Sequence, residues 1–356
     1  MTNTRTIGLN HIYLDTQIED YSNISTGYIL RALGHGLKIA YVDCENKSSK
    51  FSNFLENLSL SYSFTKNFPK LNMDIYTFKK NQIVSRTLIP QVEFANLTLD
   101  MFWKQLLKHE YDLIIFDNSN FEHITKFKMI NILNSKSSNT EIITIFNNEK
   151  DYKEIKSYFD LNCELSFKKN TKGLSNIKSI LNITGMGRGK SLFSYGYLIR
   201  SYIQKKDVKL IYFDKEQGLY GEQHFFKALK CWAKENELYG TFDFVSTGKK
   251  RFNGATYRKE NTSDDIKEAK EGLMLLKTSL LKQTPVVADE LNSVINSELL
   301  DQDEVLQVLE KVKHELIITG IKSPLKIKKI SSLILSIKST KDYLKKNKGY
   351  RKGIDY

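Results

Sequence analysis

The stretch "LNITGMGRGKSLFSYG", residues 181–196, decides which fold we expect for this chain. The apolar run "ILNITG" predicts a strand, and "KSLFSYGYLIRSYI" predicts a helix that starts directly after a group of glycines. Gly185, Gly187 and Gly189 would let the backbone approach phosphate groups and point N–H groups at them. A strand, a glycine-rich loop and a helix in this order are typical of a phosphate-binding loop.

The side chains next to these glycines suit the same ligand. Lys190 would neutralise phosphate charge, Ser191 would offer its hydroxyl to Mg²⁺, and the helix would add its positive dipole end. The glycine spacing is one residue shorter than the common pattern G-x-x-x-x-G-K-[ST]. A tight strand-to-helix turn without a ligand is the alternative that this stretch alone leaves open.

A second nucleotide signature is "PVVADE", residues 285–290, an apolar strand that ends in two acids. Ligands of open parallel sheets bind at the carboxyl ends of the strands, so Asp289 and Glu290 could hold Mg²⁺ there, directly or through water. The alternative is a solvated helix N-terminus, where acids are also favoured. The loop and the acid pair together favour a nucleotide site.

Apolar runs and helical patterns alternate through the second half of the chain. A helix is expected from a cap-like Ser263 and another from Asp301, each followed by acids and apolar residues at helical spacing. Such alternation indicates an α/β fold with mainly parallel sheets. The expected strands lie within "IKSILNITG", "VKLIYFD", "FDFVSTG", "TPVVADE", "ELIITGI" and "SLILSIK".

The two halves of the chain share a plan. Ser25, Gly27 and Arg31 stand opposite Ser194, Gly196 and Arg200 at a constant shift of 169 residues (194 minus 25). After one small gap "LKIAYVD" answers "VKLIYFD", "YDLIIFDNSN" answers "TPVVADELNS", and "TEIITI" answers "ELIITG". We interpret this order as a tandem duplication with a polar joint at residues 166–175. The prediction is two tandem P-loop NTPase-like (RecA-like) domains, residues 1–165 and 174–356.

The first half lacks the phosphate chemistry of the second. At the same shift its loop is "TQIEDYS", residues 16–22, without the three glycines or the lysine. Glu19 and Asp20 would repel phosphate. Asp117 keeps the place of Asp289, but Asn118 replaces the glutamate. We therefore expect a degenerate domain without a functional phosphate loop.

Composition narrows the function classes. The net charge of +13 is spread over the chain without a basic cluster interleaved with aromatics, so no nucleic-acid partner is expected. No apolar run reaches the roughly 18 residues of a membrane span, and the start lacks an apolar signal core. The three scattered cysteines fit a reducing compartment, so a cytoplasmic location is expected. The six histidines show no ligand spacing.

The second half resembles a known family. "TGMGRGKSLFSYG" is similar to the T-G-x-G-K-G-K-T-x-x-A-x-G loop of the P-loop-type ATP:cob(I)alamin (corrinoid) adenosyltransferases, whose loop is also one residue short. "IYFDKEQGLYGE" resembles the family's Q-F-I-K-G…G-E segment through Lys215, Gly221 and Glu222. "VVADE", "LIITG" and the closing "GIDY" also match. The resemblance covers roughly residues 177–356.

The resemblance implies that Co(I) of a reduced corrinoid attacks the 5′ carbon of ATP and that triphosphate leaves, giving adenosylcobalamin. No protein nucleophile is needed, and Lys190 and Arg188 would position the substrate. ATP is then a co-substrate, the corrinoid is the substrate, and a flavoprotein is a candidate reductant. The implied ATP-binding residues are Thr184, Gly185, Met186, Gly187, Arg188, Gly189, Lys190, Ser191, Lys215 and Glu222. The implied magnesium ligands are Ser191, Asp289 and Glu290.

The chain departs from the family mainly on the corrinoid side. Ile321 replaces an arginine, Asp342 replaces the histidine after Lys341, and Ser336 replaces an acid. The family's aromatic loop is missing, which leaves Phe252 or Tyr257 as candidate covers for the corrinoid. A non-catalytic ATP- or corrinoid-binding protein that delivers or senses the cofactor is therefore the alternative. Because the family commonly works as a dimer, we expect either a homodimer or an intramolecular pseudo-dimer with the first half as an inactive partner.

Overall fold

The chain divides into two compact units. Unit 1 comprises residues 1–165, 220–228 and 339–356, and unit 2 comprises residues 166–219 and 229–338. Each unit therefore contains more than one stretch of sequence, and the division into functional domains at residues 165 and 174 stays a prediction. The computed structural model describes residues 9–14, 22–44, 49–68, 71–79, 82–88, 93–119, 129–131, 140–170, 180–236, 239–249, 252–253, 256–257, 260–282, 284–341 and 354.

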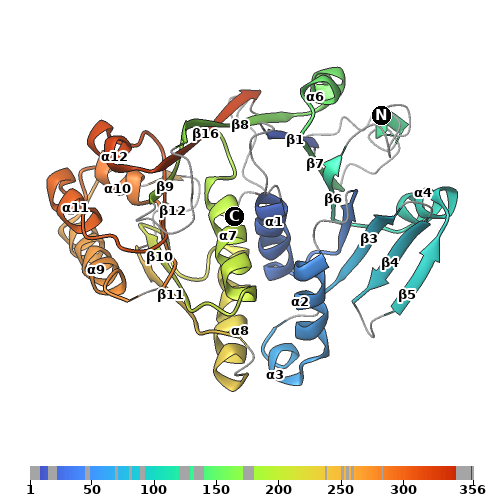
Figure 1. The fold of residues 1–356 in the computed structure, drawn as a ribbon, viewed down its shortest axis with the longest axis horizontal. Coiled ribbons are helices and arrows are strands. Elements are labelled where there is room, and N and C mark those ends of the chain that lie inside the picture. Colours follow the sequence, from blue (N-terminus) through green and yellow to red (C-terminus); the bar gives the residue numbers. More distant parts are fainter. Residues whose placement is uncertain are drawn as a thin grey trace. The chain divides into compact units, whose positions relative to one another are not determined.

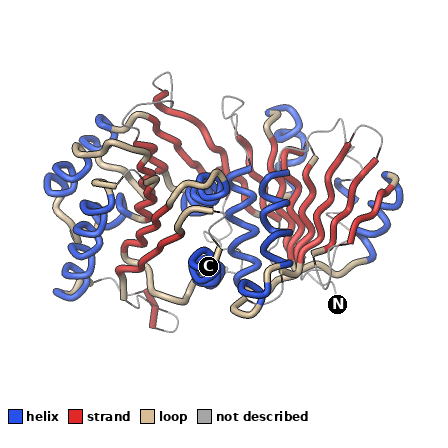
Figure 2. Tube along the Cα trace, turned by 60° about the horizontal axis from the view of Figure 1, so that its bottom comes forward, coloured by secondary structure: helices blue, strands red, loops and turns tan. Residues whose placement is uncertain are grey.

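Unit 2 is built on a parallel sheet, shown in red in Figure 2. The strand order is β11-β10-β14-β15-β9-β16. All six expected runs contain strands of this sheet, and the apolar side chains of the inner strands β9, β10, β14 and β15 are buried. The strands are β9 (Ile180–Thr184), β10 (Val208–Phe213), β11 (Phe242–Thr247), β14 (Val286–Asp289), β15 (Leu316–Thr319) and β16 (Leu333–Lys341).

The helices of unit 2 cover both faces of this sheet. From β9 through β10 to β11 the chain moves across the sheet toward the β11 edge, and α7 covers one face (Figure 1). From β11 through β14 and β15 to β16 it moves back across the sheet, and α9 to α12 cover the other face. Right-handed crossovers require this arrangement. The α9 face packs a continuous apolar core against β10, β14 and β15. The helices are α7 (Lys190–Ile203), α9 (Ser263–Ser279), α10 (Leu291–Asn296), α11 (Gln302–Leu309) and α12 (Leu325–Ile330). Helix α8 (Gly221–Glu235) starts in unit 1, to which residues 221–228 belong, and ends in unit 2.

The two predicted helix starts differ in outcome. Asp301 caps α11 as expected, because its side chain accepts from the N–H groups of Asp303 and Glu304. The cap of α9 is Thr262 and not Ser263. Thr262 and Asp265 bond reciprocally in a capping box, which satisfies two N–H groups that a cap at Ser263 would leave open.

Unit 1 has a larger sheet with the order β8-β1-β7-β6-β2-β3-β4-β5. It is parallel up to β3, and β3-β4-β5 is antiparallel. The strands are β1 (Leu9–Leu14), β2 (Ile39–Asp43), β3 (Met73–Lys79), β4 (Gln82–Thr87), β5 (Glu93–Leu97), β6 (Leu113–Ser119), β7 (Glu141–Phe146) and β8 (Leu161–Asn170). The helices are α1 (Ser22–Gly34), α2 (Ser49–Leu60), α3 (Tyr62–Thr65), α4 (Leu99–Lys108), α6 (Glu149–Ile155) and the short η1 (Lys156–Tyr158).

The two sheets repeat one topology. The order β3-β2-β6-β7-β1-β8 in unit 1 corresponds strand by strand to β11-β10-β14-β15-β9-β16 in unit 2. The antiparallel strands β4 and β5 extend unit 1. The fold class is confirmed: both units are α/β with mainly parallel sheets, as P-loop-like domains are. A duplication as the origin of this repeat stays a prediction.

No helix within the described ranges is long and apolar enough to span a membrane.

Candidate functional site

The phosphate loop lies between β9 and α7, as the sequence predicts. Gly185 and Gly189 have φ angles of +112° and +98°, which side chains rarely adopt. A Cβ atom at Gly185 would lie 2.2 Å from the carbonyl oxygen of Ile337 in β16, and one at Gly187 would lie 2.6 Å from the Cγ2 atom of Ile337. The Gly187 N–H also donates to the Ile337 carbonyl (2.9 Å). The packing of the loop against β16 therefore requires Gly185 and Gly187, and the left-handed backbone favours glycine at position 189, in addition to any role toward phosphate.

The start of α7 supplies positive charge to this loop. Lys190 is its first residue, and the Lys190 Nζ atom donates to the Gly187 carbonyl (2.7 Å), so the ammonium lies against the loop. Helix α7 is 14 residues long, and its N-terminus bears the positive end of the helix dipole. Met186, at the tip of the loop, is exposed. A phosphate group at this loop would meet both Lys190 and the backbone N–H groups.

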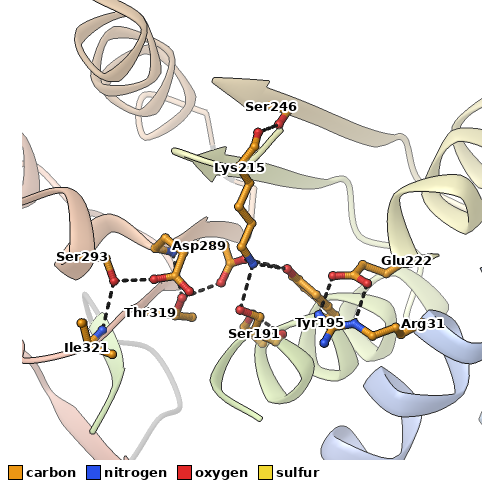
Figure 3. Close-up of polar contacts among 12 residues, drawn as sticks. Arg31, Ser191, Tyr195, Lys215, Glu222, Ser246, Asp289, Ser293, Thr319 and Ile321 are labelled. Atoms are coloured by element: carbon orange, nitrogen blue, oxygen red, sulfur yellow. Dashed lines mark hydrogen bonds and ion pairs between the residues drawn. The ribbon is translucent and has the colours of Figure 1, made fainter. Parts of the chain in front are cut away.

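Lys215 connects the loop helix to the acidic strand. It is 7% exposed and follows β10 by two residues. Figure 3 shows its Nζ atom directed at three oxygen atoms: Asp289 Oδ2 (2.5 Å), Ser191 Oγ (3.1 Å) and the Tyr195 hydroxyl (3.1 Å). The ammonium is therefore fixed by one ion pair and two hydrogen bonds.

Asp289 is the centre of this cluster and is fully buried at the end of β14. In addition to the bond from Lys215, the carboxylate of Asp289 accepts two hydrogen bonds. The Tyr195 hydroxyl donates to Oδ2 (2.5 Å), and the Thr319 hydroxyl donates to Oδ1 (2.5 Å). Burial by itself raises the pKa of Asp289. The charge of Lys215 and the hydrogen bonds from Lys215, Thr319 and Tyr195 outweigh burial, and they hold this pKa below its usual range. The group is therefore an ionised carboxylate with donors on both oxygens.

The side chains predicted to hold Mg²⁺ do not fit a directly bound ion in this arrangement. The Lys215 ammonium bonds Ser191 Oγ and Asp289 Oδ2, which belong to two of the three predicted magnesium ligands. Glu290 has a left-handed backbone (φ +67°), and its carboxylate accepts from the Ser293 hydroxyl. Among the residues described, no group of three or more His, Cys, Asp or Glu side chains could hold a metal ion.

Glu222, one of the predicted ATP-binding residues, forms a buried ion pair with an arginine. It belongs to unit 1, is fully buried, and accepts from Arg31 through Nε and Nη2, both at 2.7 Å. Its predicted contact with ATP stays a prediction. Arg188 lies in the loop and is half-buried.

Two members of the cluster were missed at the sequence level. Tyr195 follows Ser191 by four residues, so helical spacing places both on one face of α7. Thr319 ends β15, the neighbour of β14, at the same sheet edge as Asp289. Both signals were present in the sequence: Tyr195 stands at a variable position of the family's loop, and Thr319 belongs to the matching segment "LIITG" but was given no role.

A buried polar network lies beneath the loop. Asn182 in β9 donates to the hydroxyls of Ser323 (2.8 Å) and Ser331 (3.1 Å) and accepts from Asn292 of α10 (3.0 Å). The Ser323 N–H donates to the Thr184 hydroxyl (3.0 Å). The strand that precedes the loop is thus hydrogen-bonded to the helix that follows Asp289.

The structure describes some of the positions that depart from the family pattern, and the others lie outside the described residues. Ile321 is 37% exposed, and its N–H donates to the Ser293 hydroxyl (3.1 Å). Ser336 pairs in register with Thr184, and Lys341 donates to the Phe159 carbonyl within unit 1. Phe252 and Tyr257 are paired in the short hairpin of β12 (Phe252–Asn253) and β13 (Thr256–Tyr257), and their side chains lie outside the description. Asp342 and the last residues other than Ile354 also lie outside it.

Unit 1 keeps the buried aspartate without the lysine. Asp117 in β6 corresponds to Asp289 and accepts from the hydroxyls of Ser25 (2.6 Å) and Tyr41 (2.7 Å). Cys44, directly after β2, stands where Lys215 follows Asp214 in unit 2. The cation of the unit 2 cluster is thus absent from this position. Of the divergent loop, residues 16–21 lie outside the described part.

The comparison with protein families agrees with these observations. The model of the family described as ATP:corrinoid adenosyltransferase BtuR/CobO/CobP matches residues 177–356, just over half of the chain. The match covers the loop, Lys215 and Asp289. It also covers residues 220–228 and 339–356, the two segments from the second half of the chain that belong to unit 1. No curated protein matches the chain.

Proposed function

The chain belongs to the ATP:corrinoid adenosyltransferase family, and on this premise we propose that it transfers the 5′-deoxyadenosyl group of ATP to Co(I) of a reduced corrinoid. A Co–C bond forms at the 5′ carbon while the C–O bond to the triphosphate breaks. Both electrons of the new bond come from Co(I), which becomes Co(III), and triphosphate leaves with the electrons of the broken bond. The proposed product with cobalamin is adenosylcobalamin.

The observation that supports this proposal is the loop at the N-terminus of α7, with Lys190 folded against it and the anchored Lys215 close to Ser191. Leaving-group charge develops on the triphosphate, and prearranged N–H groups and ammonium groups stabilise such charge best. The protein's task is then to orient ATP and to neutralise its triphosphate. The corrinoid is the nucleophile, so no protein nucleophile is assigned.

The remaining expectations form part of the same proposal. Mg²⁺ is proposed to accompany ATP, and Asp289 and Glu290 would hold it through water; no step is assigned to it. A flavoprotein is the proposed reductant of the corrinoid, and the proposed compartment is the cytoplasm. The proposed assembly is an intramolecular pseudo-dimer or a homodimer, with unit 1 as a partner that does not itself bind ATP.

The test is anaerobic adenosylation with ATP, magnesium and chemically reduced cobalamin, followed through loss of the Co(I) absorbance band. We expect the wild-type chain to convert cobalamin and Lys190→Ala to lose about 100-fold or more in kcat/KM, the effect of removing one charge-stabilising donor. The exposed Lys313→Ala is the matched control and should keep the wild-type rate. ATP binding without any conversion would contradict the enzyme and support the cofactor-binding alternative.

A further inference from the structure

Arg31 of α1 forms an extensive buried contact that the proposed mechanism does not use. Its guanidinium makes a bidentate ion pair with Glu222, and the two side chains are 7% and 0% exposed (Figure 3). The partners are 191 residues apart in sequence, yet both belong to unit 1. Bidentate arginine–carboxylate pairs are strong and fix geometry, so Glu222 is held in one orientation.

The same guanidinium also holds the end of the chain. Arg31 Nη1 donates to the carbonyl oxygen of Ile354 (3.2 Å), a buried residue two positions before the last. One side chain of the first half thus binds two separate segments of the family-matched range, the start of α8 and the closing "GIDY".

Backbone packing supports this contact. A Cβ atom at Gly34 would lie 1.7 Å from the carbonyl oxygen of Gly221, and one at Gly221 would lie 2.2 Å from the carbonyl oxygen of Arg31. Helix α1 and the start of α8 therefore approach as closely as two glycines allow. Further along α8, Phe225 packs edge-to-face on Phe64 (5.5 Å between ring centroids) and Phe68 (5.3 Å).

The counterpart of Arg31 in the second half has a different environment. Arg200 stands on α7 at the shift of 169 residues, and it is exposed, whereas Arg31 is buried. Burial of this arginine, together with the carboxylate of Glu222, is thus a property of the first half.

We propose that Arg31 is a positioning residue for the adenosyl transfer, acting through Glu222 and Ile354. This inference rests on the proposed function. Glu222 ends the segment "IYFDKEQGLYGE", residues 211–222, which contains Lys215, so fixing Glu222 in unit 1 fixes one end of that segment. The loop, Lys190 and Asp289 have their own contacts in unit 2. Loss of Arg31 should therefore slow the transfer while ATP binding is kept.

The experiment compares full-length Arg31→Met, Glu222→Gln and the double variant with wild type. We measure kcat and the KM for ATP, equilibrium binding of ATP, and amide hydrogen exchange. Arg31→Met should lower kcat at least tenfold with the Kd for ATP within threefold of wild type. Amides of residues 220–228 should lose protection, whereas those of α7 and β14 should keep it. Because both residues act through one contact, the double variant should lose no more than Arg31→Met alone. Arg200→Met, the matched control, should behave as wild type.

Several outcomes would overturn the inference. Wild-type kcat and protection in both Arg31→Met and the milder Glu222→Gln would show that the contact positions nothing. If the fold-loss of kcat in the double variant equals the product of the two single losses, and its Kd for ATP is raised, Glu222 contacts the nucleotide independently of Arg31. Loss of protection throughout the chain in both single variants would indicate a purely structural role. Failure of the wild type to adenosylate would instead overturn the proposed function, so the two failures are distinguishable.

Discussion

At the scale of single residues, the buried pair of Lys215 and Asp289 dominates the site. Both side chains are almost completely excluded from water and lie 2.5 Å apart. Such a pair is costly to form and gains its stability only from good geometry and further hydrogen bonds. Tyr195, Thr319 and Ser191 provide those bonds. The site is therefore prearranged by hydrogen bonding before any ligand binds.

We predict that Asp289→Asn lowers the free energy of unfolding by about 3–5 kcal/mol at pH 7, because it leaves the buried Lys215 charge uncompensated. The folded-state pKa of Asp289 lies below its ordinary value of 3.8. Its contribution to stability is hence complete above that value and is lost as the pH falls through the folded-state pKa. The difference between wild type and variant in urea unfolding should shrink below about pH 4. Asp264→Asn, which breaks an exposed pair with Lys249, should leave the transition unchanged. A difference that stays constant down to pH 3 would contradict the assignment.

At the scale of elements, the sequence predicted what local chemistry determines. The six strands of unit 2 were identified because each lies in a short apolar run of the sequence. The loop was identified because glycines stand between a strand and a helix. The cap of α9 was misplaced by one residue because Ser263 and Thr262 are both capable caps, and only the reciprocal bond with Asp265 distinguishes them.

Other features lay beyond sequence reasoning for a physical reason. The family resemblance assigns Glu222 to ATP, and no periodicity or spacing in the sequence indicates that it also pairs with Arg31. The same holds for Ile337, whose backbone sets the need for glycine at two loop positions. Contacts between segments that are far apart in the sequence depend on tertiary packing. Periodicity and spacing within one sequence carry no information on such contacts.

A glycine substitution tests the loop at this scale. Gly185→Ala places a Cβ atom against the Ile337 carbonyl and forces an unfavourable φ angle. Strain at such a position costs about 1–3 kcal/mol, so we expect the loop to move away from β16 and ATP affinity to fall at least tenfold. The control is Gly36→Ala, which also has a positive φ angle (+73°) but no atom within 4 Å. It should lose a little stability and no ATP affinity, as measured by thermal unfolding and equilibrium binding. Equal affinities for the two variants would show that the approach of the loop to β16 does not matter.

At the scale of the whole molecule, each unit repeats one strand order, yet the units divide the chemistry unequally. Unit 2 has the glycine loop, Lys190 and the Lys215 cluster. Unit 1 keeps the buried aspartate and replaces the lysine with Cys44. Unit 1 also contains two segments of the family-matched range, residues 220–228 and 339–356. A relic of duplication would not need to contain parts of the other half, so we expect the first half to be necessary.

Truncation tests this expectation directly. A chain that starts at Leu174 keeps the whole family-matched range but loses Arg31, Phe64 and the Phe159 carbonyl, which bind the two segments in unit 1. Phe225 and Ile354, both buried in the complete chain, would then lose their cover. Because exposed apolar surface of this kind drives association, the truncated chain should aggregate or self-associate. Size-exclusion chromatography with light scattering measures this, and co-expression of residues 1–173 should restore a soluble complex with adenosylation activity. A truncated chain that stays monomeric and as active as the full-length protein would show that the first half is dispensable and end the idea of a built-in partner.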